Sequence, residues 1–180
     1  MRIVKDETIA LFVDYQEKLM PVIYDKEAII KNSAVLARGL GELGVPILVS
    51  QQYTKGIGET VPEIKEAISD FTPLEKMSFS CYDSENIKKA IDESNCKNVV
   101  LCGTEAHVCV QQTLVDLRAE GYNVILVVDC IGSRTEINKD VALKRAAYEG
   151  SILTTYEALL FELTRHSGAP AFKAVSKLVK

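Results

Sequence analysis

Short apolar runs alternate along the chain with longer segments whose hydrophobic residues recur at helical spacing. The runs are continuous rather than alternating, which is typical of strands covered on both faces of a sheet. They are Ile9–Val13, Ile47–Val49, Asn98–Gly103, Tyr122–Val128 and Ile152–Thr154, and Leu74–Phe79 is a weaker candidate because it contains Lys76. This pattern predicts about six strands, each separated from the next by a turn or a helix.

The segments between the strands carry helix start and stop signals. Residues that can cap a helix stand at the starts, and glycine or proline follows the ends. The expected helices run from Asp25 to Gly44, from Ser84 past Ile91, from Cys109 to Gly121, from Asn138 to Gly150 and from Tyr156 to Thr164, with a short one at Val61–Glu63 and an amphipathic tail carrying Phe172, Val175 and Leu178 on one face. The polar, glycine-containing stretch 51–60 is expected to be a loop.

Alternating strands and helices favour a parallel sheet with helices on both faces. We therefore expect residues 1–180 to form a single domain, a doubly wound three-layer α/β/α sandwich. In the common strand order of such sheets, 3-2-1-4-5-6, ligands bind beyond the carboxyl ends of the strands, where the order reverses between strands one and four.

Composition adds limits on function and location. The chain has 180 residues, 47% hydrophobic and 26% charged, and a net charge of −4, so nothing favours a nucleic-acid partner. No apolar run approaches the ~18 residues that span a bilayer, and the N-terminus lacks the features of a signal peptide. The 5 cysteines are scattered without a C-x-x-C pair, which favours reduced thiols in the cytoplasm.

Two candidate catalytic groups stand at the expected strand-order reversal. Asp14 closes the first strand, and Cys109 lies in the first helical turn after the fourth. The pKa of a thiol is often lowered near a helix N-terminus, and a nearby carboxylate can act as the general base for the thiol. The alternatives are that Cys109 is a small buried hydrophobe and that Asp14 only caps a helix.

Lys76 would complete the set, because an ammonium stabilises a thiolate and keeps a carboxylate ionised. Alone, it would be an ordinary surface lysine. His107 stands too near Cys109 in sequence to face it, and the spacing of His107 and His166 matches no metal motif. Nucleotide-binding glycine patterns are also missing, so we expect neither a metal nor a cofactor.

Several segments resemble the isochorismatase-like cysteine hydrolases, in order over nearly the whole chain. They are IALFVDYQEKLMPVI, SQQYTKGIGETVPEI, EKMSFSCYD, GTEAHVCVQQT, VVDCIGSR and SILTTYEALLFELT. The resemblance is greatest to the YcaC-related or isochorismatase-domain branch, whose specificity is uncertain.

The resemblance implies a six-stranded doubly wound α/β sandwich with a catalytic triad of Cys109, Asp14 and Lys76. It also implies a cis peptide at Thr104–Glu105 and an oxyanion hole formed by the backbone N–H groups of Glu105 and Cys109. Similar proteins form homo-oligomers, so we expect a dimer or a larger assembly.

Two departures narrow the choice within the family. The loop after the second strand has no histidine, unlike the metal cluster of nicotinamidases, and the cysteine is retained, unlike some isochorismatases that cleave a vinyl ether. Both favour hydrolysis of an amide-type C–N bond in a small molecule through a thioester. Vinyl ether hydrolysis, a thiol redox function and a binding protein with a vestigial site remain alternatives. The candidate substrate-binding residues are Tyr15, Gln16, Gln52, Tyr53, Phe79 and Tyr82.

Overall fold

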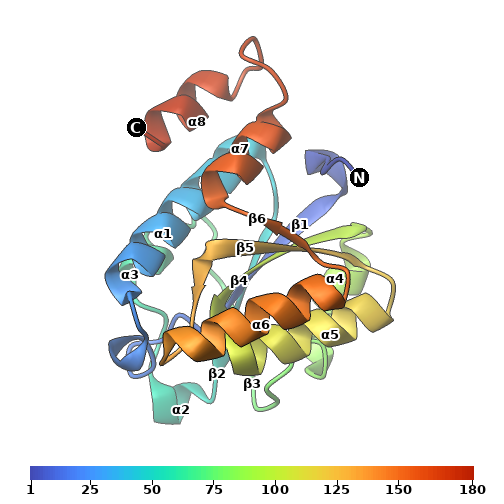
Figure 1. Cartoon of the computed structure of the whole chain (residues 1–180). Coiled ribbons are helices and arrows are strands. Elements are labelled where there is room, and N and C mark those ends of the chain that lie inside the picture. Colours follow the sequence, from blue (N-terminus) through green and yellow to red (C-terminus); the bar gives the residue numbers. More distant parts are fainter.

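The computed structural model describes residues 1–180 and contains one parallel, 6-stranded sheet in the order β3-β2-β1-β4-β5-β6 (Figure 1). The strands are β1 (Thr8–Val13), β2 (Ile47–Gln52), β3 (Pro73–Lys76), β4 (Asn98–Thr104), β5 (Asn123–Gly132) and β6 (Ile152–Thr154). The predicted fold class and strand order are therefore confirmed. The order reverses between the neighbours β1 and β4, which is where a doubly wound sheet places its ligand.

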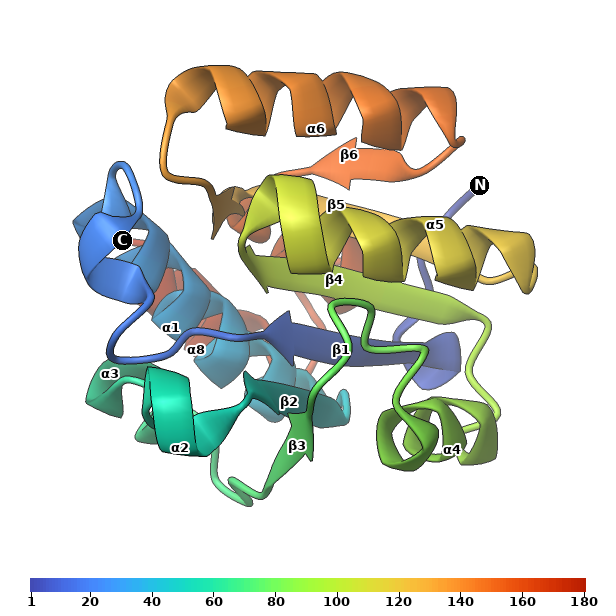
Figure 2. The ribbon, with the colours of Figure 1, turned by 90° about the horizontal axis from the view of Figure 1, so that it is seen from below.

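Helices cover both faces of the sheet, as Figures 1 and 2 show. On one face α1 packs against α7, α8 and β5, and on the other α5 and α6 pack against each other and β5. The helices are α1 (Lys26–Leu43), α2 (Thr54–Ile57), α3 (Pro62–Lys65), α4 (Glu85–Glu93), α5 (Gln111–Ala119), α6 (Glu136–Tyr148), α7 (Tyr156–Thr164) and α8 (Phe172–Leu178).

The central strands are buried on both faces, as their continuous apolar runs predict. Every residue of β1 and of β4 is buried, and the two strands pair along their lengths, with Val13 opposite Gly103. Their main-chain hydrogen bonds are thus removed from water on both sides. This makes the ends of β1 and β4 a rigid base for side chains beyond the sheet edge.

Several element boundaries differ from those predicted. Strand β2 continues to Gln52, and α2 begins at Thr54, so the stretch predicted as a loop is largely regular structure. Helix α6 begins at Glu136, because Thr135 accepts a hydrogen bond from the backbone N–H of Asn138 and caps it. Asp25 and Ser84 stand at the N-cap positions of α1 and α4, but neither side chain makes a capping hydrogen bond.

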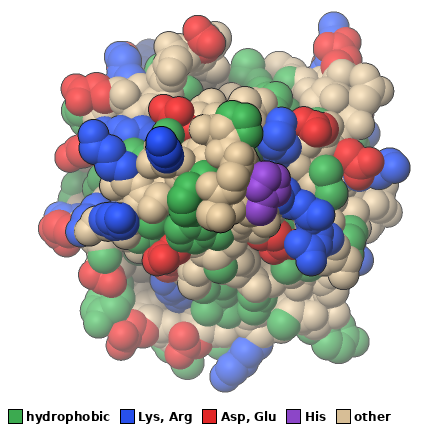
Figure 3. All heavy atoms as spheres, turned by 90° about the horizontal axis from the view of Figure 1, so that it is seen from above, with side chains coloured by type: hydrophobic (Ala, Val, Ile, Leu, Met, Phe, Trp, Pro, Cys, Tyr) green, Lys and Arg blue, Asp and Glu red, His purple; other side chains and the backbone are tan.

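The C-terminal helix packs on its own chain, as expected for an amphipathic tail. Val175 of α8 is fully buried, and α8 contacts α1 and α7. Figure 3 shows a face of the molecule on which acidic and basic side chains are interspersed. None of the helices combines the length and the apolar character that crossing a membrane requires.

Candidate active site

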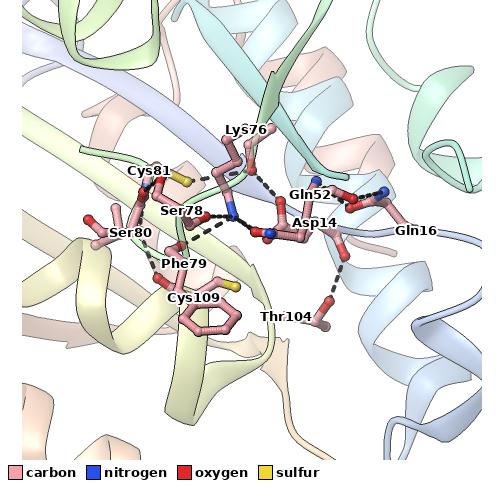
Figure 4. A network of polar contacts seen from close by, with 12 residues as sticks. Asp14, Gln16, Gln52, Lys76, Ser78, Phe79, Ser80, Cys81, Thr104 and Cys109 are labelled. Atoms are coloured by element: carbon pink, nitrogen blue, oxygen red, sulfur yellow. Dashed lines mark hydrogen bonds and ion pairs between the residues drawn. The ribbon is translucent and has the colours of Figure 1, made fainter. Parts of the chain in front are cut away.

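The Asp14 carboxylate lies just beyond the end of β1, with no exposure to solvent (Figure 4). Its backbone is left-handed, with φ of 51°. Ser50, in the neighbouring strand β2, donates a hydrogen bond of 2.6 Å from Oγ to Oδ1 of Asp14. Lys76, at the end of β3, donates one of 2.7 Å from Nζ to Oδ2. Both carboxylate oxygens are therefore held by groups from adjacent strands.

The Lys76 ammonium is surrounded by oxygen atoms and is itself fully buried. Besides Asp14, it donates to Oε1 of Gln52 at 2.7 Å and to the carbonyl oxygens of Ser78 and Phe79 at 3.1 and 3.2 Å. Burial lowers the pKa of Lys76, but the negative charge of Asp14 raises it, and the net pKa is raised. Lys76 is thus a permanent cation at neutral pH.

Cys109 is carried by a π-helical turn, η3 (Ala106–Val110), between β4 and α5. Such single turns are rare and occur often at functional sites. The carbonyl of Cys109 accepts a hydrogen bond of 2.7 Å from the hydroxyl of Thr113, one turn along, which fixes the backbone behind the thiol. Cys109 itself is 6% exposed, with its sulfur on the side of the Asp14–Lys76 pair in Figure 4.

The electrostatics of Cys109 differ from the sequence expectation of a lowered thiol pKa. Burial and the charge of Asp14 raise the pKa of Cys109 to about 12, while Lys76 alone acts in the opposite direction. The desolvation of a thiolate in this enclosed turn outweighs the benefit of a helix N-terminus. At neutral pH the raised pKa leaves Cys109 a neutral thiol beside the ion pair of Lys76 and Asp14.

A second thiol lies in the same network. Cys81 is fully buried and its Sγ is 3.5 Å from Oγ of Ser50. Burial and the charge of Asp14 raise the pKa of Cys81 to about 11. The backbone N–H of Cys81 donates to the same Thr113 hydroxyl that binds the carbonyl of Cys109, so the two cysteine segments are fastened to one side chain.

The peptide between Thr104 and Glu105 is cis, as the family resemblance implied. The carbonyl of Glu105 accepts hydrogen bonds from the N–H groups of Val108 and Val110, whereas its own N–H donates to no group of the chain. Its carboxylate receives two hydrogen bonds from Arg134, of 2.9 and 3.0 Å. His107 does not join the thiol: its Nδ1 lies 2.9 Å from Oγ of Ser133.

Two of the candidate substrate-binding residues, Tyr15 and Gln16, are buried and make hydrogen bonds within the chain. Tyr15 is fully buried, and its hydroxyl lies 2.7 Å from Oγ of Ser33 and donates to the carbonyl of Cys130 at 2.5 Å. Gln16 is also fully buried, and its amide bonds the backbones of Gln52 and Gly58. Neither side chain presents a free polar group to the site.

The other four candidates, Gln52, Tyr53, Phe79 and Tyr82, differ in whether they contact Lys76. Gln52 contacts Lys76 and donates to the carbonyl of Met77, so its amide orients the lysine. Tyr53 and Phe79 are 44% and 55% exposed, and the carbonyl of Phe79 accepts a hydrogen bond from Lys76. Tyr82 is directed away, since its hydroxyl donates to Asp92 on α4.

A groove of about 840 Å³ borders the site without reaching the thiol. It runs along the outer edge of β3 between Tyr53 and Lys89, and Lys76 is the only member of the Asp14, Lys76 and Cys109 set that lines it. We therefore do not place the reaction in it. No three or more histidine, cysteine, aspartate or glutamate side chains are grouped as metal ligands would be.

Sequence reasoning missed residues that support the candidate catalytic groups. Ser50 binds the Asp14 carboxylate, Thr113 binds the backbone carbonyl of Cys109, and Arg134 binds the side chain of Glu105. Ser50 carried a detectable signal, since it is a polar residue at the end of an apolar run beside the expected strand-order reversal. Thr113 and Arg134 lie in the family segments GTEAHVCVQQT and VVDCIGSR, but nothing in the sequence indicated which groups they bind.

The chain combines a doubly wound α/β fold with a turn that carries Cys109 beside the buried ion pair of Lys76 and Asp14. This combination defines the class of protein. The chain matches the isochorismatase domain over residues 8–158 and belongs to the isochorismatase family. It is 35% identical over 180 residues to isochorismatase domain-containing protein 2A of Mus musculus, covering 99% of this chain and 85% of that protein. Membership of this family supports a hydrolase.

Solved structures agree with the fold. The MAR1 ribonuclease of Caenorhabditis elegans is 38% identical, with a TM-score of 0.94 over 99% of this chain and 92% of that one. YcaC of Pseudomonas aeruginosa, solved with hexane-2,5-diol and covalent acrylamide, is 24% identical with a TM-score of 0.91, over 98% and 91% of the two chains. YcaC of Escherichia coli, described as an octameric hydrolase of unknown specificity, is 23% identical with a TM-score of 0.92, over 99% and 90%.

Proposed function

We propose that this protein hydrolyses an amide-type C–N bond of a small molecule, with Cys109 as nucleophile, Asp14 as general base and acid, and Lys76 as the cation that organises them. The observation that carries the proposal is the fully buried ion pair of Lys76 and Asp14, 2.7 Å apart, beside a thiol that is neutral at rest. A buried charge pair is costly to maintain for stability alone, which favours a chemical role.

The first half of the reaction forms a thioester. Cys109 Sγ attacks the carbonyl carbon while Asp14 takes the thiol proton, and the carbonyl oxygen becomes an oxyanion. The N–H groups of Glu105 and Cys109 stabilise this oxyanion, a contribution of ~3–4 kcal/mol for a donor of this kind. The C–N bond then breaks, and the leaving amine or ammonia takes the proton from Asp14.

The second half returns the enzyme to its resting state. Asp14 removes a proton from water, the hydroxide attacks the thioester carbon, and the C–S bond breaks. The sulfur of Cys109 regains its proton from Asp14, and the acid product leaves. Lys76 stays protonated throughout, because its pKa is raised, and it prevents Asp14 from becoming an isolated buried charge in either half.

A screen with ammonia detection tests this function. Purified protein is assayed against small amides, imides and carbamoyl compounds, with Cys109→Ser as the test variant and Cys81→Ser as the matched control at the neighbouring thiol. We expect a substrate whose turnover is lost in Cys109→Ser and kept in Cys81→Ser. Full activity in Cys109→Ser contradicts the proposal, and cleavage of a vinyl ether but no C–N bond favours the ether alternative.

Acrylamide provides a substrate-independent check, since the YcaC of Pseudomonas aeruginosa was solved with covalent acrylamide. The amide-bearing electrophile should add to Cys109, as a single mass increment located by peptide mapping. Cys96 is the comparison, because it is the cysteine that is only partly buried. Addition to Cys96 before Cys109 counts against proton removal by Asp14, because the raised pKa otherwise leaves the Cys109 thiol neutral.

A second candidate function follows from the relative described as a ribonuclease. RNA cleavage by this chain would require attack at phosphorus rather than at a carbonyl carbon. Incubation of purified protein with a labelled single-stranded RNA, with and without EDTA, tests it. Cleavage that co-purifies with the protein and disappears in both Asp14→Asn and Cys109→Ser would establish this activity in the same site.

We also propose that the protein is a cytoplasmic homo-oligomer with a small-molecule substrate and without a cofactor or a membrane partner. All of its cysteines are free thiols, which is the usual state in a reducing compartment. The octameric YcaC relative supports an assembly of copies. The outer face of α6 supports it further, because Ile137, Val141 and Tyr148 are 65%, 53% and 87% exposed there.

A further inference from the structure

Arg134 and Glu105 form an ion pair whose two members have very different environments. The Glu105 side chain is 8% exposed, whereas that of Arg134 is 62% exposed. Nε of Arg134 binds one carboxylate oxygen at 2.9 Å and its NH2 nitrogen binds the other at 3.0 Å. This parallel two-point geometry fixes the orientation of a carboxylate, which a single contact does not.

The pair connects the turn that carries the thiol to the loop that follows β5. Ser133, next to Arg134, contacts His107 in the same turn, and its carbonyl accepts a hydrogen bond from the N–H of Tyr24. Glu105 is thus held by its carboxylate and by its carbonyl, while its N–H is left without a partner inside the chain. A donor with fixed surroundings and no internal partner is suited to receive a negative oxygen.

We propose that Arg134 is a positioning residue, whose two-point contact with Glu105 holds the N–H of Glu105 in the direction needed to stabilise the oxyanion of the reaction. This role rests on the proposed function, since it requires an oxyanion formed at Cys109. Arg134 itself touches no reacting atom. Its effect is on the geometry of a single donor.

An ordinary surface salt bridge contributes little to stability, and the pair of Arg145 and Glu149 is an example of one within this chain. Arg145 contacts Glu149 one turn along α6 through Nε only, and both side chains are partly exposed. Glu105, in contrast, is nearly buried and both its oxygens are engaged. Lysine at position 134 could supply the charge but not the planar two-point contact.

Two reagents separate thiol reactivity from oxyanion stabilisation. Iodoacetamide alkylates Cys109 by displacing iodide at a saturated carbon, so no oxyanion forms. A small aldehyde adds reversibly: the sulfur bonds to the carbonyl carbon, and the carbonyl oxygen takes the negative charge and then the proton. The concentration of propionaldehyde or benzaldehyde that protects Cys109 from iodoacetamide therefore reports how well the donors of the site bind the adduct oxygen, which takes the position of the oxyanion.

For Arg134→Ala we expect protection by aldehyde to require about tenfold more reagent, because a donor displaced by a fraction of an ångström loses much of its effect. The iodoacetamide rate without aldehyde should stay within about twofold, since neither Arg134 nor Glu105 is among the charges that shift the Cys109 pKa. Arg134→Lys should lie nearer to Arg134→Ala than to the wild type. Arg145→Ala, the matched control, should match the wild type in both measurements.

Unchanged aldehyde protection in Arg134→Ala would overturn the role. An equal fall in aldehyde protection and in the iodoacetamide rate would also overturn the role, because that pattern indicates a loosened turn. If Arg134→Ala does not fold, Arg134→Gln and Glu105→Gln test the same contact with less change in volume. Failure of aldehyde to protect the wild type, or of iodoacetamide to label its Cys109, instead contradicts the proposed function and removes this role with it.

Discussion

The hydroxyl of Thr104 donates a hydrogen bond of 2.7 Å to the backbone carbonyl of Asp14. The bond joins the end of β4 to the residue after β1, where the strand order reverses. Both residues are fully buried. The proposed base and the peptide that precedes the proposed oxyanion donor are therefore fixed to each other directly. Any change in the spacing of β1 and β4 should therefore move the proposed base and the proposed oxyanion donor together.

Gly103 sets that spacing, and Gly103→Ala should be strongly destabilising. Its φ is +131°, and a Cβ there would lie 2.1 Å from the backbone carbonyl oxygen of Val13. Because backbone cannot rotate out of the way as a side chain can, we expect a loss of about 3 kcal/mol in the free energy of unfolding. Urea denaturation measures it.

Gly41→Ala is the matched control within the same chain. A Cβ at Gly41, in the last turns of α1, meets nothing within 4 Å. Alanine should stabilise the helix by about 0.5–1 kcal/mol, since glycine is the weaker helix former. Equal effects of the two substitutions would show that β1 and β4 can separate without cost.

The fold could be predicted because its signals are local and repeated. Continuous apolar runs marked the buried strands, and Asp14 and Cys109 were found because polar residues follow those runs at the ends that a doubly wound sheet brings together. Contacts that depend on side-chain geometry between distant segments gave no such signal. The pairing of Glu105 with Arg134 is of this kind.

The misjudged thiol pKa has a related cause. Position near a helix N-terminus is visible in a sequence, but the extent of desolvation is not, and burial is the largest influence on Cys109. Tyr15 illustrates the same limit. It follows Asp14 directly, yet the chain turns there and directs its hydroxyl into the core instead of the site.

Tyr15→Phe should separate stability from activity. The hydroxyl of Tyr15 satisfies the buried carbonyl of Cys130 and pairs with Ser33, so its removal leaves buried polar groups without a partner. We expect the free energy of unfolding to fall by about 1–3 kcal/mol. Alkylation and aldehyde protection of Cys109 should stay unchanged at temperatures where the variant is folded. A selective loss of aldehyde protection would return Tyr15 to the substrate-binding set.

Buried thiols should make the protein sensitive to alkaline pH. Burial raises the pKa of Cys102 to about 12, above the ~8.5 of a thiol in an unfolded chain. Below pH ~8.5 both states bind the proton, and above it the unfolded state releases the proton first, so stability is lost as pH rises. The fall in unfolding free energy between pH 8 and 11 should be smaller in Cys102→Ala than in the wild type. Parallel pH profiles would contradict this.

The outer face of α6 should be an interface between copies of the chain. Val141→Glu places a charge in the middle of the exposed apolar row formed with Ile137 and Tyr148. Light scattering should give the wild type a mass of at least a dimer at micromolar concentration, and the variant a smaller one. Lys31→Glu, a change at an exposed, already charged residue of α1 on the other side of the sheet, is the control. A monomeric wild type would refute the assembly.

The titration of Cys109 gives the most direct test of the proposed site. Asp14 raises the pKa of this thiol and Lys76 lowers it, so removal of each should move the pKa in opposite directions. The pH at which thiolate-dependent labelling of Cys109 by iodoacetamide begins to rise should be lower in Asp14→Asn and higher in Lys76→Met than in the wild type. Asp14→Asn should nevertheless lose turnover of any substrate found by screening, because no base remains to activate water. The absence of a shift in both variants would mean that the thiol does not sense the pair, and the assignment of the three residues to one site would be wrong.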